Sequence, residues 1–233
     1  GDRERGRPQM SWRIFIRLES EAIFSSGESA PAEADLDIVR DDHGFPGYGA
    51  RRLKGMWREH TEFAARALSS GGRNVRLYQD MMQVIERCFG RGGLHDFVEG
   101  QLRLTDSVLP LEVRKPFLEA IHRGELHPQE VFESLTTIRY FTAIDPDTGT
   151  MQNRSFRQFR VLFEGIELVS EVFGMDDLQE REIGLLTCGL VGWRYAGVMK
   201  HRGKGRIHVS LWKDGENVTD RYLEAAREWV KAS

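Results

Sequence analysis

The sequence predicts an α+β fold, and three observations lead to that class. The segment SWRIFIRLE at residues 11–19 alternates strictly between apolar and polar positions, as a half-buried β-strand does. Residues 52–68 and 75–89 place apolar side chains at helical spacing, which indicates amphipathic helices. Further strand-type segments recur later in the chain, so one chain combines both kinds of element.

Length and composition favour a single domain. The chain has 233 residues, of which 40% are hydrophobic and 30% charged, as in an ordinary soluble globular protein. That length suits one core with an insertion better than two full domains, so residues 10–233 are expected to form the domain. Residues 1–9 are expected to be a loose arm or a remnant of expression. No apolar run approaches the roughly 20 residues that span a bilayer, so we expect a cytoplasmic or nucleoid-associated protein.

An acidic loop joins the first strand to the first helix. One face of the strand is apolar, and the other is basic and aromatic, with Arg13, Phe15 and Arg17. The loop ends in a turn rich in glycine and proline, and the helix at residues 52–68 follows. The helix at residues 75–89 stops at a run of glycines.

The rest of the chain completes the pattern. A strand is expected within residues 97–109, then two short helices at about residues 111–123 and 128–135. Residues 137–171 are expected to form a long hairpin, with a turn at residues 145–149 and one returning strand. The last expected elements are a helix capped by Asp176 and Asp177 that reaches about residue 191, a basic glycine-rich loop, a strand at residues 206–212 and a helix capped by Thr219. Without the central helices the order is βαββαβ, that of a ferredoxin-like or RNA-recognition-type sheet.

Basic residues are segregated along the chain although the net charge is −3. Residues 51–58 contain four bases and no acid, and residues 151–163 contain three arginines and no acid. Residues 183–213 contain six bases and no acid. Three such stretches supply what a track for a phosphate backbone needs, because local fields rather than the total charge govern contact with nucleic acid.

The loop before the first helix is as acidic as the helix start is basic. Residues 19–42 contain eight acids and one base. This reversal suits a metal-assisted phosphate reaction or a structural charge pairing, and residue types alone favour the second. Asp41 and Asp42 are better explained as turn formers beside Gly44. His43 could be the general base of a metal-free ribonuclease, but a single loop histidine more often has no such role.

Two of the basic stretches contain features that favour phosphate contact. Residues 200–206 interleave glycines with bases and lack acids, which makes a phosphate cradle; a flexible loop with solvated lysines is the alternative. Arg52 and Lys54 lie at a helix start, where the helix dipole disfavours cations unless an anion binds. Pairing with Asp41 or Asp42 would satisfy them equally.

Three motifs follow one another along the chain. The first is SSGE at residues 25–28, followed by ADLDIVRDDHGFP and RRLKGMWRE; the second is TAIDPDTGTMQNRSFRQFRVLFEG at residues 142–165; the third is HRGKGRIHVSL at residues 201–211. In this order they resemble the RAMP superfamily of CRISPR-associated proteins, in particular the backbone subunits of type III RNA-guided effector complexes. The sequence departs from that pattern at PGYGA, residues 46–50, where many members have Pro-Tyr-Ile-Pro-Gly.

This resemblance implies both a fold and a function. The fold is a ferredoxin-like palm with a helical insertion at about residues 75–135 and a thumb hairpin at about residues 137–171. Copies of such a subunit line up on guide RNA (crRNA) beside other effector subunits, and complementary target RNA is cleaved with Mg²⁺ or another divalent metal. The family's catalytic aspartate falls on Asp35, which would also bind the metal, and Asp37 is a near alternative.

The resemblance and the charge pattern together predict the RNA contacts. The expected RNA-binding residues are Arg51, Arg52, Lys54, Arg58, Arg154, Arg157, Lys200, Arg202, Gly203, Lys204, Gly205 and Arg206. Three alternatives stay open: a non-catalytic subunit that caps the guide 5′ end or an inactive backbone copy, a guide-processing ribonuclease that uses His43, and a ferredoxin-like protein outside RNA biology.

Overall fold

The centre of the molecule is an antiparallel sheet. A computed structural model describes residues 11–24, 38–92, 98–141, 157–198 and 203–233. The sheet order is β4-β7-β1-β8-β9, with every neighbouring pair antiparallel. Its strands are β1 (Trp12–Leu18), β4 (Arg103–Leu104), β7 (Glu167–Phe173), β8 (Ile207–Lys213) and β9 (Glu216–Asn217). With β1 central between β7 and β8 and β4 outside β7, this is the arrangement of a βαββαβ sheet, so the predicted fold class is confirmed.

The side chains of β1 alternate between the two faces of this sheet. Trp12, Ile14, Ile16 and Leu18 are buried, as the alternation of the sequence predicts. The opposite surface, which we call the open face, is formed by Arg13, Phe15 and Arg17 of β1, by Glu167, Val169 and Glu171 of β7, and by His208, Ser210 and Trp212 of β8. Apart from Ser210, which is buried, these side chains are exposed or half-buried.

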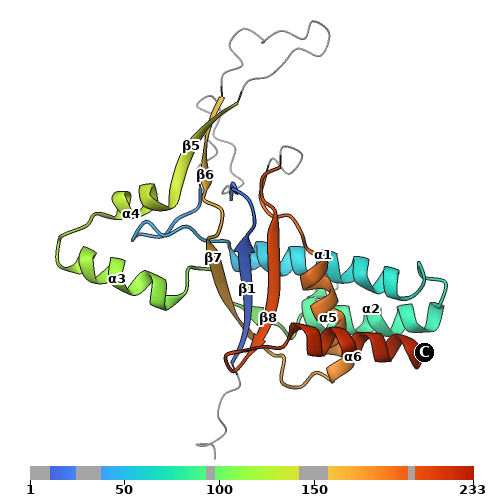
Figure 1. The fold of residues 1–233 in the computed structure, drawn as a ribbon. Coiled ribbons are helices and arrows are strands. Elements are labelled where there is room, and N and C mark those ends of the chain that lie inside the picture. The colour runs from blue at the N-terminus through green and yellow to red at the C-terminus, as the bar shows by residue number, and fades with distance from the viewer. Residues whose placement is uncertain (1–10, 25–37, 93–97, 142–156, 199–202) are drawn as a thin grey trace, which may run out of the picture.

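Helices pack against the apolar face of the sheet (Figure 1). They are α1 (Ala50–Leu68), α5 (Glu180–Gly192) and α6 (Thr219–Lys231), while α2 (Val75–Phe89) packs against α1. Helices α1 and α5 touch so closely that a Cβ on Gly189 would lie 2.2 Å from Thr61 Oγ1. The indole N–H of Trp57 in α1 also donates to the Leu186 carbonyl of α5 at 2.8 Å. These contacts with α5 therefore fix the position of α1 relative to the sheet.

The hairpin is separate from the central sheet. Strand β5 (Thr136–Phe141) pairs with β6 (Arg157–Leu162) in a two-stranded sheet of its own, which projects beyond β1 and β8 (Figure 1). The prediction of a single returning strand is wrong, because this segment forms two strands, β6 and β7, separated by a turn. Gly165, with φ of 85°, makes the turn there, and its N–H donates to the Leu18 carbonyl at 2.8 Å. The turn predicted at residues 145–149 lies outside the described residues.

The central insertion contains two helices and little sheet. Helices α3 (Leu111–His122) and α4 (Pro128–Leu135) form where helices were predicted, and β2 (Gly90–Arg91) pairs with β3 (Val98–Glu99). The single strand predicted within residues 97–109 is divided into β3 and β4, and its later residues make only isolated bridges, from Ser107 to Tyr48 and from Val108 to Val169. Across the described ranges, no helix combines the length and the apolar character that crossing a membrane requires.

Two predicted helix caps are wrong. Helix α5 begins at Glu180, where Gln179 and Glu182 form a capping box, and Asp176 instead accepts the indole N–H of Trp12 at 2.7 Å. Thr219 is the first residue of α6, and its hydroxyl accepts the Leu211 N–H at 2.9 Å. Both polar side chains bond to the sheet instead of to their own helix.

Candidate nucleic-acid interface

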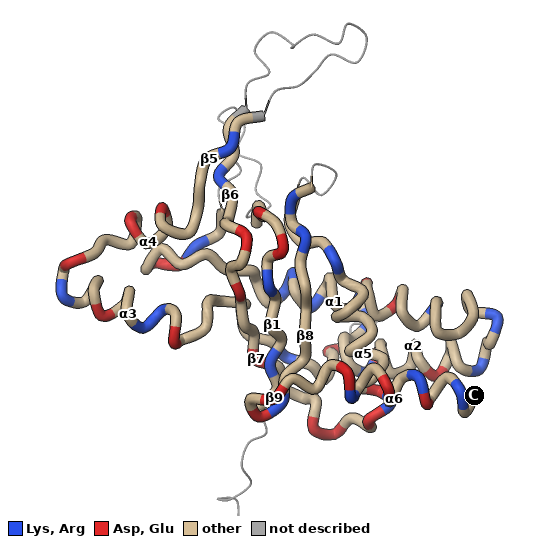
Figure 2. Tube along the Cα trace, viewed as in Figure 1, with Lys and Arg blue, Asp and Glu red and all other residues tan. Residues whose placement is uncertain are grey.

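The segment after β1 joins the hairpin to the loop that enters β8. Ala22 exchanges backbone hydrogen bonds with Leu162 of β6, with N···O distances of 3.2 and 2.7 Å. The Ile23 carbonyl accepts the Val198 N–H at 3.1 Å, and the Glu21 carbonyl accepts the Gly205 N–H at 2.8 Å. Figure 2 shows Lys and Arg residues on both the hairpin base and the loop before β8. Three segments far apart in sequence therefore meet at one basic edge of the molecule.

The Glu21 side chain is the centre of this edge. Its Oε1 accepts Arg139 Nε at 2.9 Å and Nη2 at 2.5 Å, and its Oε2 accepts Lys204 Nζ at 2.5 Å. The hydrogen bond from Arg139, assisted by Lys204, lowers the pKa of the Glu21 carboxyl. One carboxylate thus ties β5 of the hairpin to the glycine loop, and the three groups together keep one positive charge in excess.

Among the described residues of the glycine loop, Gly197 and Gly205 both have a positive φ and a backbone oxygen so near that a Cβ would clash with it. Gly205 has φ of 75°, and a Cβ there would lie 2.0 Å from the Ala196 carbonyl oxygen. Gly203 has a similar φ of 73° but open space around the Cβ position. Of the predicted bases, Lys204 is paired with Glu21, and Arg206 lies 2.9 Å from Glu19 through Nε. Lys200 and Arg202 lie outside the described residues.

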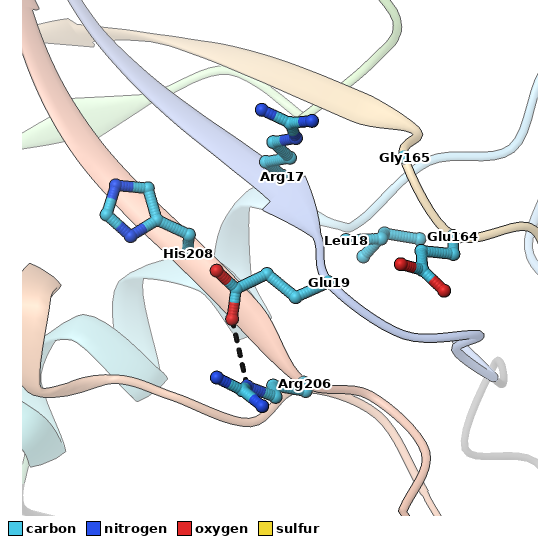
Figure 3. Close-up of a pocket in the computed structure, with 7 residues that line it drawn as sticks. All are labelled: Arg17, Leu18, Glu19, Glu164, Gly165, Arg206 and His208. Atoms are coloured by element: carbon cyan, nitrogen blue, oxygen red, sulfur yellow. Dashed lines mark ion pairs between the residues drawn. The ribbon is translucent and has the colours of Figure 1, made fainter.

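Arg206 also lines a cleft of about 530 Å³, which lies where β1 ends and β8 begins (Figure 3). The cleft is lined by Arg17, Leu18, Glu19, Glu164, Gly165, Arg206 and His208. Two strands therefore contribute cations to one hollow, although Glu19 already neutralises Arg206.

A second cleft, of about 460 Å³, lies at the start of α1 and is lined by Arg51 and Arg52. Both arginines are exposed, and the Arg52 guanidinium lies over the Tyr48 ring at 5.8 Å. Burial raises the pKa of the Tyr48 hydroxyl to about 12, so this wall of the cleft stays neutral. The first residue of the helix is also partly satisfied, because Ala50 N–H donates to Asp106 Oδ1 at 2.7 Å.

Two described residues that flank the predicted catalytic segment in the sequence line this second cleft. Phe24 and Val39 line the cleft, and the Val39 N–H donates to the Phe24 carbonyl at 3.1 Å. Asp35 and Asp37 lie between these two residues and outside the described part of the chain.

Lys54 and Arg58 both donate hydrogen bonds to other parts of the chain. Lys54 Nζ donates to the Leu102 carbonyl at 2.6 Å, and burial lowers its pKa. Arg58 donates to Glu62 Oε1 at 2.8 Å and to the Gly90 carbonyl at 2.9 Å. These contacts lead toward the insertion, away from the cleft that Arg51 and Arg52 line.

The other predicted residues are only partly described. Arg154 lies outside the described residues, and Arg157 occupies β6 opposite Phe141. Asp41 is a turn former, as predicted, because its Oδ1 accepts the N–H groups of His43 and Phe45. Sequence reasoning missed Glu21 and Arg139, because Glu21 is one of eight acids in residues 19–42 and its partners Arg139 and Lys204 are distant in the chain.

The described residues do not form a metal site. Within them, no group of three or more His, Cys, Asp or Glu side chains could hold a metal ion. His43 is exposed in its turn. Magnesium therefore enters below only as part of a proposal about Asp35.

The βαββαβ sheet and the projecting hairpin form an α+β, ferredoxin-like fold. No family model matches the chain, and no curated protein sequence matches it significantly. A chain of Type III-B Cmr-beta in the apo state, solved by cryo-EM, has a TM-score of 0.58 at 14% identity, over 88% of this chain and 98% of that one. A chain of Type III-B Cmr-beta bound to cognate target RNA has a TM-score of 0.57 at 14% identity, over 86% and 96%. The resemblance seen in the motifs is therefore confirmed at the level of the fold.

Proposed function

We propose that this chain is a guide-RNA-binding backbone subunit of a type III CRISPR effector complex. The observation that carries the proposal is the shared fold with chains of Type III-B Cmr-beta, one of them in a structure with cognate target RNA, over nearly the whole length of those chains. The segregated cations support it, because a phosphate backbone is bound mainly by Lys and Arg.

Guide phosphates bind at the basic edge. Arg51 and Arg52 are exposed at the start of α1, where the helix dipole also attracts an anion. The Glu21 group adds one positive charge at the hairpin base. Arg206 contributes in part, since it remains 61% exposed while it pairs with Glu19. The partners are guide RNA, complementary target RNA and other effector subunits, including copies of this chain.

Target cleavage is the finer part of the proposal. A carboxylate at Asp35, or at Asp37, would hold a divalent metal such as Mg²⁺, which supplies charge stabilisation at the scissile phosphate. Phe24 and Val39, the described residues that bound the segment of Asp35 and Asp37 in the sequence, line the cleft of Arg51 and Arg52, and this supports the proposal. The test is whether Asp35→Ala abolishes the cleavage of target RNA that EDTA inhibits in wild type.

The experiment that tests RNA binding is the affinity of the purified chain for guide RNA as a function of salt. We expect the logarithm of the association constant to fall linearly with the logarithm of the salt concentration, with a slope of about −0.7 for each phosphate contacted on a single strand. Affinity that is weak and independent of salt would instead identify a ferredoxin-like protein outside RNA biology. Cutting of guide precursor that persists in EDTA and disappears in His43→Ala would identify a guide-processing ribonuclease.

A further inference from the structure

The open face of the sheet carries an aromatic pair that the basic edge does not use. The rings of Phe15 in β1 and Trp212 in β8 lie 5.0 Å apart between centroids, tilted by 48°. Both side chains are half-buried, so each still presents part of its ring to solvent. The Trp212 indole is held by a hydrogen bond of 2.9 Å to Ser210 Oγ. The pair is therefore a fixed aromatic platform on this face, which also carries the apolar side chains of Val169 and Phe173 on β7.

Cations flank this platform along β1. Arg13 and Arg17 are the next residues on the same face, each about 7 Å along the strand from Phe15. Arg13 lies opposite Trp212 and 3.7 Å from Glu171, so its charge is largely balanced. The Arg17 side chain makes no hydrogen bond or ion pair with any described residue, although Glu167 lies opposite it on β7. Arg17 is thus a cation of this face that can still take an anion, as is the exposed Arg103 of β4 at the far edge of the face.

Arg17 and His208 enter the cleft beside the platform. They lie opposite each other on β1 and β8 and line the 530 Å³ cleft (Figure 3). The carboxylate of Glu19 in that cleft is taken by Arg206 at 2.9 Å. His208, like Arg17, has no partner among the described residues. Among the described residues the side chains of Arg17 and His208 are therefore without a partner in this cleft, as is the Glu164 carboxylate, and the Arg17 and His208 row lies one row from Phe15 and two rows from Trp212.

A base and its phosphate match this arrangement. Every nucleobase has a face that stacks on an aromatic ring, and a guanidinium fork binds phosphate oxygens. Bases of single-stranded RNA are available for stacking, whereas those in a duplex are not. The acids Glu167 and Glu171 limit the total charge of the face, so stacking rather than phosphate contact would supply most of the affinity.

We propose that the open face is a second RNA site, which adjoins the basic edge at Arg206 and binds single-stranded RNA. One base stacks on the Phe15 and Trp212 pair, and its phosphate is bound by Arg17 and His208. In an effector complex this site would hold an unpaired stretch of guide or target.

The test uses the full chain and a labelled single-stranded RNA of about six nucleotides. We expect Phe15→Leu and Trp212→Leu each to lower the affinity about 5- to 100-fold with the salt slope unchanged. Arg17→Gln should reduce the steepness of that slope by about 0.7, the loss of one phosphate contact. Phe63→Leu is the matched control, because Phe63 is 56% exposed on α1, and it should bind as wild type does.

Two outcomes overturn the proposal. One is wild-type affinity in both aromatic variants when their circular dichroism is native. The other is equal affinity for an abasic strand of the same length, which keeps the phosphates and removes the bases. Arg51→Gln with Arg52→Gln separates the two sites. If those changes abolish guide binding while the short RNA still depends on Phe15, the open-face site is supported independently of the basic edge.

Discussion

Glu21 binds two cations that come from distant parts of the chain. Arg139 is 118 residues away and Lys204 is 183 residues away, yet both donate to the same carboxylate. Its side chain is 17% exposed, so water competes only partly for these bonds. At the scale of the residue, this one acid decides how firmly the hairpin is attached to the glycine loop.

The lowered pKa of Glu21 predicts a pH dependence. A carboxyl with a lowered folded-state pKa contributes stability above its ordinary pKa of about 4.3, and this contribution is lost as the pH falls through the folded-state value. We therefore expect Glu21→Gln to be less stable than wild type at pH 7 and to approach it in acid. Urea unfolding across that pH range measures this. Glu164→Gln is the control, because Glu164 is exposed and has no partner among the described residues; a parallel loss in both variants would contradict the prediction.

Gly205 and Gly203 form a matched pair for mutation. Both have positive φ, so alanine at either position costs about 1–2 kcal/mol of backbone strain. Only at Gly205 would the new Cβ also meet a backbone oxygen, that of Ala196, at 2.0 Å. We expect Gly205→Ala to reduce the free energy of unfolding clearly more than Gly203→Ala in urea titrations. Equal losses would show that the loop relaxes around the added methyl group.

At the scale of elements, patterns along the chain predicted some features well. Helix α2 spans Val75–Phe89, as its apolar spacing indicates, and β1 buries the face that its alternation selects. Local sequence could not show that β6 and β7 belong to different sheets, because Gly165 bonds to Leu18, far away in the chain. Lys54 illustrates the same limit, since its partner is the carbonyl of Leu102.

The start of α1 is predicted to be a phosphate site. Arg51 and Arg52 are exposed there, and no acid lies in the first turn of the helix. We expect Arg51→Gln with Arg52→Gln to weaken guide binding and to reduce the steepness of its salt slope by up to about 1.4, the loss of two phosphate contacts. Arg66→Gln, in the last turn of the same helix, controls for the loss of a surface charge. Equal effects from both ends of the helix would contradict a localised site.

At the scale of the whole molecule, a palm, a hairpin and an insertion are held around one core. The fold class could be predicted because each strand and helix of the palm follows its own period. The candidate site could be predicted only in outline, because paired cations such as Lys204 and Arg58 look like free ones in a sequence. The shared fold with Type III-B Cmr-beta chains at 14% identity shows that this architecture tolerates almost complete replacement of its residues.

Cleavage of labelled RNA complementary to the guide tests the central claim most directly. Guide-loaded complexes would carry wild-type chain, Asp35→Ala, Asp37→Ala or, as a control, Asp42→Ala, an exposed acid of the neighbouring turn. The account predicts cuts that require Mg²⁺, that EDTA abolishes and that disappear in Asp35→Ala or Asp37→Ala while guide and target still bind. Equal cutting by all four proteins would contradict it, and tight guide binding without any cutting would identify a guide-end cap or an inactive backbone copy.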